Sequence, residues 1–196
     1  MQTKTEKTQR SEEKEAPRSF VKQLLELAIM LAVAMVLAFG IRTFLVQPFL
    51  IPTGSMIPTI KISNRLLVDK LSYRLHDPKA GDIVTFPDPT GEYPVLIKRL
   101  IATAGQVVDI QGDKLYIDGE LQDEPYVHGQ PTAKLHSPFG HQIAYPYTIP
   151  EGKAWVMGDN RGNSGDSRVF GPIDQDTITG RAFFTYWPLK DMGSLK

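Results

Sequence analysis

The feature that most constrains this chain is a long apolar segment near its N-terminus. Residues 24–46 are predominantly apolar, and residues 27–41 carry no charge. An α-helix rises about 1.5 Å per residue, so about 20 apolar residues cross the roughly 30 Å hydrocarbon core of a bilayer. The segment therefore predicts a transmembrane helix over residues 20–46, with Glu26 and Arg42 at the two membrane interfaces.

Two other interpretations of this segment stay open. A cleavable secretory signal has an apolar part of about 7–15 residues that ends in small side chains. Here Ala32-Val33-Ala34 lies inside the apolar segment, and the bulky Ile41-Arg42-Thr43-Phe44 follows it. A buried core helix is the second alternative. The length and the flanking residues favour a retained membrane anchor.

The charges around the segment predict its orientation. Lys14, Arg18 and Lys22 precede the apolar residues, whereas only Arg42 follows closely. Because Lys and Arg are enriched on the cytoplasmic side of membrane helices, we expect a cytoplasmic N-terminus. The tail over residues 1–19 is polar, with charges of both signs and no apolar period, which indicates disorder.

The remainder, residues 47–196, is the expected extracytoplasmic domain. Short runs rich in β-branched and aromatic residues are separated by Pro and Gly, and Asp118-Gly119 is typical of a two-residue β-hairpin turn. We expect a mainly β, predominantly antiparallel domain with an irregular insert at residues 122–150. The expected strands are residues 65–69, 82–86, 95–101, 106–110, 114–117, 154–157 and 178–187.

Composition narrows the possible partners and chemistry. Lys and Arg total 22, as do Asp and Glu. Nucleic-acid-binding proteins usually carry a basic excess, so nucleic acid is not an expected partner. The absence of cysteine excludes disulfides, thiolate metal sites and cysteine nucleophiles. The histidine spacing indicates no zinc site, so we expect no metal and no other cofactor. The sequence does not indicate an oligomeric state.

The first candidate for chemistry is Ser55, in residues 51–59. Pro52 and Pro58 restrict the backbone on either side of a small centre, and Gly54 lets another part of the backbone come close. Ser55 is then expected on a rigid, open turn, as a nucleophile requires. The alternative is an ordinary connector that contains Pro and Gly.

Lys98 and Arg99 interrupt the apolar strand at residues 95–101. Side chains alternate along a strand, so the two cations point to opposite faces, both otherwise apolar, and at least one is expected to be desolvated. Burial can lower a lysine pKa by up to about 3–5 units, whereas arginine keeps its proton. A neutral Lys98 could then deprotonate a serine hydroxyl. Solvated or ion-paired cations on an edge strand are the alternative.

The third candidate is a dense polar segment at residues 158–168, with two acids, two arginines and two serines. Turn chemistry with local Asp–Arg pairing is the alternative explanation.

Histidine-based serine catalysis is the main rival to a lysine base. The available histidines lie outside any structured motif, which favours exposed loop positions for them: His76, His128, His136 and His141.

These three segments, in this order behind an N-terminal apolar helix, resemble those of bacterial type I signal peptidases. The similarity covers the anchor and nearly all of the domain that follows. The matching residues are Ser55-Met56 with Pro58-Thr59, Lys98-Arg99 with Ile101 and Gly105, and residues 158–168.

The resemblance implies a membrane-anchored serine endopeptidase with a Ser-Lys dyad. Ser55 would be the nucleophile and Lys98 the general base. The Ser55 backbone N–H and the Thr53 hydroxyl would form the oxyanion hole, whose donors are typically worth about 3–4 kcal/mol of barrier each.

The resemblance also implies roles in the third segment. Ser164 would hydrogen-bond the Lys98 amine and aim it. Asp166 and Arg168 would pair and hold the segment, with Asp159 nearby.

The implied substrates are exported preproteins, cut after an Ala-x-Ala signal at the outer face of the bacterial cell membrane. They would bind extended, as an added strand. A non-catalytic, membrane-anchored β domain that binds exported chains is the alternative. Relatives commonly have Gly and Pro where this chain has Ala102 and Ala104, so the turn beyond the dyad is expected to differ. The residues implied to line shallow apolar pockets are Phe49, Ile51, Ile60, Leu96 and Ile97.

Overall fold

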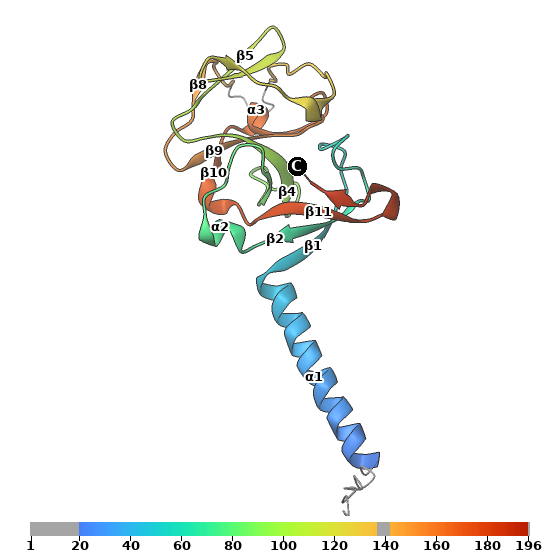
Figure 1. The fold of residues 1–196 in the computed structure, drawn as a ribbon. Helices are drawn as coiled ribbons and strands as arrows, with labels where there is room; N and C mark the ends of the chain where they lie inside the picture. Colours follow the sequence, from blue (N-terminus) through green and yellow to red (C-terminus); the bar gives the residue numbers. More distant parts are fainter. Residues whose placement is uncertain (1–19, 137–141, 196) are drawn as a thin grey trace, which may run out of the picture. The chain divides into compact units, whose positions relative to one another are not determined.

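The computed structural model describes residues 20–136 and 142–195, and the chain divides into two compact units. The first unit, Met1–Gly40, contains most of helix α1 (Phe20–Phe44), and the second, Ile41–Lys196, contains strands β1 to β12 (Figure 1). The expected tail over residues 1–19 lies outside the described residues.

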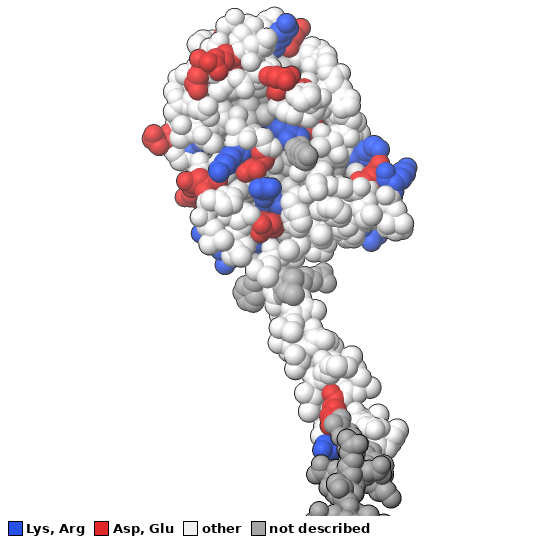
Figure 2. Space-filling view, in the orientation of Figure 1, with Lys and Arg blue, Asp and Glu red and all other residues white. Residues whose placement is uncertain are grey.

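Helix α1 is apolar around its circumference. Its span Phe20–Gly40 has a mean hydropathy of 2.1, and none of it is buried in the structure. Lys22 and Glu26 are the charged residues of that span, and Figure 2 shows a largely uncharged surface along the helix. A helix that is apolar all round needs either a protein core or lipid around it. The exposed apolar surface of the helix fits a membrane anchor.

The second unit is built from two sheets. One has the strand order β1-β2-β11-β3-β4-β9-β10, with β12 paired to β11, and the other has the order β7-β6-β5-β8. The strand pairs are antiparallel in both sheets, which confirms the predicted mainly β, antiparallel fold. The first sheet contains β1 (Val46–Leu50), β2 (Arg65–Asp69), β3 (Ile83–Phe86), β4 (Leu96–Thr103), β9 (Lys153–Met157), β10 (Ile173–Asp174), β11 (Gly180–Trp187) and β12 (Gly193–Ser194). The second contains β5 (Val107–Gln111), β6 (Lys114–Ile117), β7 (Glu120–Leu121) and β8 (Tyr147–Thr148).

Short helical turns connect the strands. They are α2 (Ser72–Leu75), η1 (Pro125–Val127), α3 (Ser167–Phe170), η2 (Gln175–Thr177) and η3 (Leu189–Asp191). The segment expected to be an irregular insert, residues 122–150, contains η1 and β8. Strand β8 pairs with β5, so this segment completes the second sheet. A two-residue strand is too short to leave an alternating pattern in the sequence.

One apolar cluster lies directly against the segment that carries Ser55. It consists of buried side chains from β2, β3, β4, β11 and the connection after β1. Met56, the residue after Ser55, is fully buried in this cluster. Burying such a side chain contributes about 1.5–3 kcal/mol, so the core holds the turn in place. The buried members are Ile51, Met56, Ile60, Leu66, Val68, Ile83, Ile97 and Ala182.

Candidate active site

Ser55 lies on a turn that is anchored on both sides. The Ile51 N–H donates to the Asn64 carbonyl at 3.0 Å, and the Ser63 N–H donates to the Ile51 carbonyl at 2.8 Å. These bonds close the connection between β1 and β2 into a loop, and the buried Met56 fixes its inner side. Ser55 itself is 8% exposed, so its hydroxyl is held in a defined position.

Lys98 reaches Ser55 from the middle of strand β4. Its Nζ lies 2.6 Å from the Ser55 Oγ, across 43 residues of sequence. The Lys98 side chain is buried, because β4 is a central strand covered on both faces. The alternative of solvated or ion-paired cations on an edge strand is therefore wrong about the strand and about solvation, although Arg99 is ion-paired, with Asp159.

Burial lowers the pKa of Lys98 from its ordinary 10.5 to about 8. The negative charges of Asp166, Asp88 and Asp159 oppose this shift, and the positive charge of Arg168 adds to it. Desolvation penalises the ammonium form, so the amine loses its proton far more easily than a surface lysine does. A neutral amine beside a hydroxyl is the arrangement needed to activate a serine.

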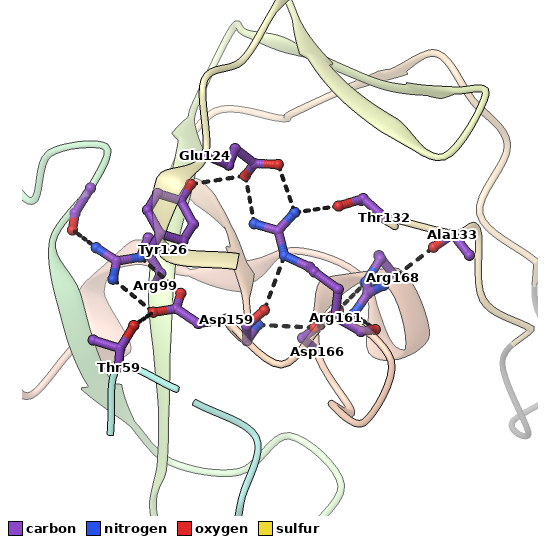
Figure 3. A network of polar contacts seen from close by, with 12 residues as sticks. Thr59, Arg99, Glu124, Tyr126, Thr132, Ala133, Asp159, Arg161, Asp166 and Arg168 are labelled. Atoms are coloured by element: carbon purple, nitrogen blue, oxygen red, sulfur yellow. Dashed lines mark hydrogen bonds and ion pairs between the residues drawn. The ribbon is translucent and has the colours of Figure 1, made fainter. Parts of the chain in front are cut away.

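Arg99, the neighbour of Lys98, serves a different purpose. Its Nε and Nη2 donate to the two carboxylate oxygens of Asp159 at 2.8 and 2.7 Å, and its Nη1 donates to the Gly81 carbonyl at 2.9 Å. The Thr59 hydroxyl donates to the same carboxylate. Asp159 thus ties β4 to the turn that carries the nucleophile (Figure 3).

Arg168 and Asp166 form a buried pair within residues 158–168, called the 158–168 loop below. Two guanidinium nitrogens of Arg168 donate to the two Asp166 oxygens at 2.9 Å each, and the Gly158 N–H donates to the same carboxylate at 3.0 Å. Burial alone would raise the pKa of Asp166, but the bonds and the charge of Arg168 hold it below its ordinary value. The pair stays ionised and fixes both ends of the loop.

Ser164 departs from what the resemblance implies. Its buried hydroxyl makes no hydrogen bond to the Lys98 amine. It acts instead on the Asp166 carboxylate, where it helps to lower the pKa of that group. The hydroxyl nevertheless lies close to the nucleophile, because a Cβ atom built on Gly158 would overlap both the Ser164 Oγ and the Ser55 carbonyl oxygen. Gly158 is therefore required for the close approach of the 158–168 loop to Ser55.

Asn160 touches the nucleophile turn, and sequence reasoning assigned it no role. Its backbone N–H donates to the Ser55 carbonyl at 3.0 Å, and its side-chain Nδ2 donates to the Gly54 carbonyl at 3.0 Å. An amide side chain does not titrate. A search for residues that can act as nucleophile, acid or base therefore does not select Asn160. Its position inside the third matching segment was the one available clue.

Two cavities meet at Ser55 and Lys98. A narrow one, about 40 Å³, is lined on one side by β1 and its continuation and on the other by the start of β4. It includes four of the five expected pocket residues, whereas Ile60 is fully buried in the core and lines neither cavity. Thr53 lines both cavities, and Tyr93, which sequence reasoning missed, does so too. The narrow cavity is lined by Phe49, Leu50, Ile51, Pro52, Thr53, Ser55, Thr85, Tyr93, Val95, Leu96, Ile97 and Lys98.

The histidines take no part in this site as far as the structure describes them. His76, His128 and His136 are exposed, and His141 lies outside the described residues. Among residues 20–136 and 142–195, no group of three or more His, Cys, Asp or Glu side chains could hold a metal ion. The reactive groups brought together here are a hydroxyl and an amine, which together suit acyl transfer.

Comparisons with known proteins show which family the chain belongs to. The family model "Signal peptidase, peptidase S26" matches residues 24–187. A probable signal peptidase I-2 from Synechocystis is 37% identical over 191 residues, which cover 94% of this chain and 82% of that protein. A signal peptidase IB from Staphylococcus aureus is 36% identical over 184 residues, which cover 87% of this chain and 93% of that protein. A crystal structure of a signal peptidase I from Enterococcus faecalis V583 aligns with a TM-score of 0.44 and 32% identity, over 54% of this chain and 97% of that one.

The family match and the two relatives thus show that the chain is a peptidase. The chain belongs to the signal peptidase family, peptidase S26.

Proposed function

We propose that this protein is a membrane-anchored serine endopeptidase that removes N-terminal signal peptides from exported preproteins, with Ser55 as nucleophile and Lys98 as general base. Family membership supports signal-peptide cleavage. The observation that carries the dyad is the 2.6 Å separation of the Lys98 Nζ and the Ser55 Oγ, both buried.

The reaction follows from that separation. A neutral Lys98 amine accepts the hydroxyl proton while the Ser55 Oγ attacks the scissile carbonyl carbon. The Ser55 N–H and the Thr53 hydroxyl stabilise the oxyanion that forms. Lys98, now an ammonium, gives its proton to the departing amine, and the peptide bond breaks to leave an acyl-enzyme. Lys98 then takes a proton from water as the water oxygen attacks the ester. The acyl–oxygen bond breaks, the signal peptide leaves with a free carboxyl group, and Lys98 returns its proton to the Ser55 Oγ.

The narrow cavity beside Ser55 supports the proposed substrate class. An apolar space of about 40 Å³ suits a small side chain. This supports cleavage after Ala-x-Ala sequences, with the peptide lying extended between β1 and β4. Phe49, Ile51, Leu96 and Ile97 would contact its small side chains.

The apolar helix supports the proposed location. Residues 20–46 would cross the bacterial cell membrane once, with residues 1–19 in the cytoplasm and residues 47–196 outside. Ser55 is 13 residues beyond Arg42 in the sequence, so at about 3.3 Å per extended residue it lies within roughly 43 Å of the membrane exit. The partners are then the lipid bilayer and the preproteins that emerge from it.

The full chain in detergent micelles, given a preprotein with an Ala-x-Ala site, tests the function. We expect one cut after the second Ala, and its loss in both Ser55→Ala and Lys98→Met. Asp123→Asn, a change at an exposed position, is the matched control and should cleave like the parent. If the parent binds the preprotein but does not cut it, the chain is a non-catalytic binding domain and the proposal fails.

A further inference from the structure

The segment between β7 and β8 reaches back to the active site through one carboxylate. Glu124, directly before η1, accepts hydrogen bonds from the Arg161 Nη1 and Nη2 at 2.8 and 2.5 Å. The two side chains are 8% and 0% exposed. Arg161 belongs to the 158–168 loop, so this pair joins two segments that are 37 residues apart in sequence.

The Arg161 guanidinium also donates hydrogen bonds to two groups other than Glu124. Its Nε donates to the Gly158 carbonyl at 3.0 Å, and its Nη1 donates to the Thr132 hydroxyl at 2.5 Å. The residue before it, Asn160, holds the carbonyls of Gly54 and Ser55. The contacts that fix Arg161 therefore also fix Asn160, whose backbone N–H and side-chain amide hold the turn that carries Ser55.

Tyr126 links the same carboxylate to the strand of the base. Its hydroxyl donates to Glu124 at 2.8 Å, and its ring lies 4.0 Å from the Arg99 guanidinium carbon. Arg99 is the neighbour of Lys98 on β4. Figure 3 shows Glu124 between the Tyr126 hydroxyl and the Arg161 guanidinium, above the Arg99–Asp159 pair.

We propose that Glu124 is a positioning residue for the peptidase reaction, because it holds Arg161 and Tyr126 and thereby the backbone of Ser55. This inference rests on the proposed function. A buried guanidinium that loses its carboxylate is strongly destabilised in place and must shift toward other partners. A mutation far from the reacting atoms that misplaces a catalytic group by about 1 Å can cost about 100-fold in rate.

The test compares Glu124→Gln, which keeps the shape and removes the charge, with Asp123→Asn, the same change at the preceding exposed position. Rates are measured on the full chain in micelles, at a temperature where melting curves show every variant fully folded. We expect kcat to fall about tenfold in Glu124→Gln with KM unchanged, since the substrate cavity is not touched. Equal kcat values for the two variants overturn the inference, as does a rise in KM alone.

A milder variant covers the case in which Glu124→Gln does not fold. Tyr126→Phe removes the hydroxyl bond to Glu124 and keeps the ring beside Arg99, and Tyr116→Phe is its control. We expect kcat of Tyr126→Phe to fall about threefold, in line with the loss of one hydrogen bond of about 1 kcal/mol. An unchanged kcat in Tyr126→Phe then overturns the inference.

A spectroscopic measurement separates this inference from the proposed function. The parent chain has three asparagines, so ¹⁵N labelling of the asparagine side chains gives signals from three amide groups, to which the Asp123→Asn control adds a fourth. We expect the Asn160 signal to move in Glu124→Gln and to stay in Asp123→Asn. If the parent cuts no preprotein, the proposed function fails and this signal alone decides the coupling: movement supports it, and no movement overturns it.

Discussion

Asn160 holds the backbone of Ser55, through a hydrogen bond of 3.0 Å from its N–H to the Ser55 carbonyl. Its side chain extends the same contact to Gly54. The loop that carries Asn160 is itself held by buried ion pairs, Arg168 with Asp166 and Arg161 with Glu124. The geometry of the hydroxyl thus depends on groups that never touch it.

Replacing Asn160 by Ala should therefore slow the reaction more than it destabilises the fold. The change removes the bond to Gly54 and leaves the backbone bond intact, which costs about 1 kcal/mol of stability. We expect kcat to fall about tenfold because the turn is less well fixed. Steady-state kinetics beside a urea melt would check this, and an unchanged kcat would contradict it.

Activity should rise with pH as Lys98 loses its proton. Because the pKa of Lys98 is lowered to about 8, the neutral base becomes tenfold more abundant with each pH unit below that value and levels off above it. A pH profile of kcat/KM on the free enzyme measures this directly. A midpoint near 10.5, the ordinary lysine value, would mean that the amine is not desolvated.

Lys98→Met should stabilise the protein at neutral pH while abolishing cleavage. Below about pH 8 both the folded and the unfolded states carry the ammonium, and the folded state bears its full desolvation cost. Between about pH 8 and 10.5 the unfolded chain binds more protons, so the stability of the parent rises with pH. We expect a gain on the order of 1–3 kcal/mol for Lys98→Met at pH 7, vanishing above about pH 10.5, in denaturant melts. A loss of stability at pH 7 would refute this.

Gly158 and Gly162 offer a matched pair of substitutions in the same loop. A methyl group at Gly158 overlaps the Ser164 Oγ and the Ser55 carbonyl oxygen, whereas one at Gly162 meets nothing within 4 Å. We expect Gly158→Ala to lose about 1–3 kcal/mol of stability through overpacking and at least about 100-fold in kcat through displacement of the turn. Gly162→Ala should match the parent in both melting temperature and rate. Similar behaviour of the two variants would show that the close approach does not matter.

The secondary structure and the reactive groups could largely be read from the sequence. The apolar helix, the hairpin turn at Asp118-Gly119 and the strand carrying Lys98 and Arg99 all depend on local patterns that a short window contains. Strands β8, β10 and β12 have two residues each and leave no such pattern. They exist because longer neighbouring strands offer them hydrogen-bond partners.

The same distinction between local pattern and tertiary contact applies to the candidate active site. By itself, the sequence determined which side chains can react: a serine on a Pro- and Gly-bounded turn, and a lysine inside an apolar strand. Tertiary structure alone decided that both cations of β4 are buried, that Ser164 makes no hydrogen bond to Lys98, and that Glu124 supports the 158–168 loop. These outcomes depend on contacts between residues 37 to 60 positions apart, and only sheet packing brings such residues together and removes the water around them.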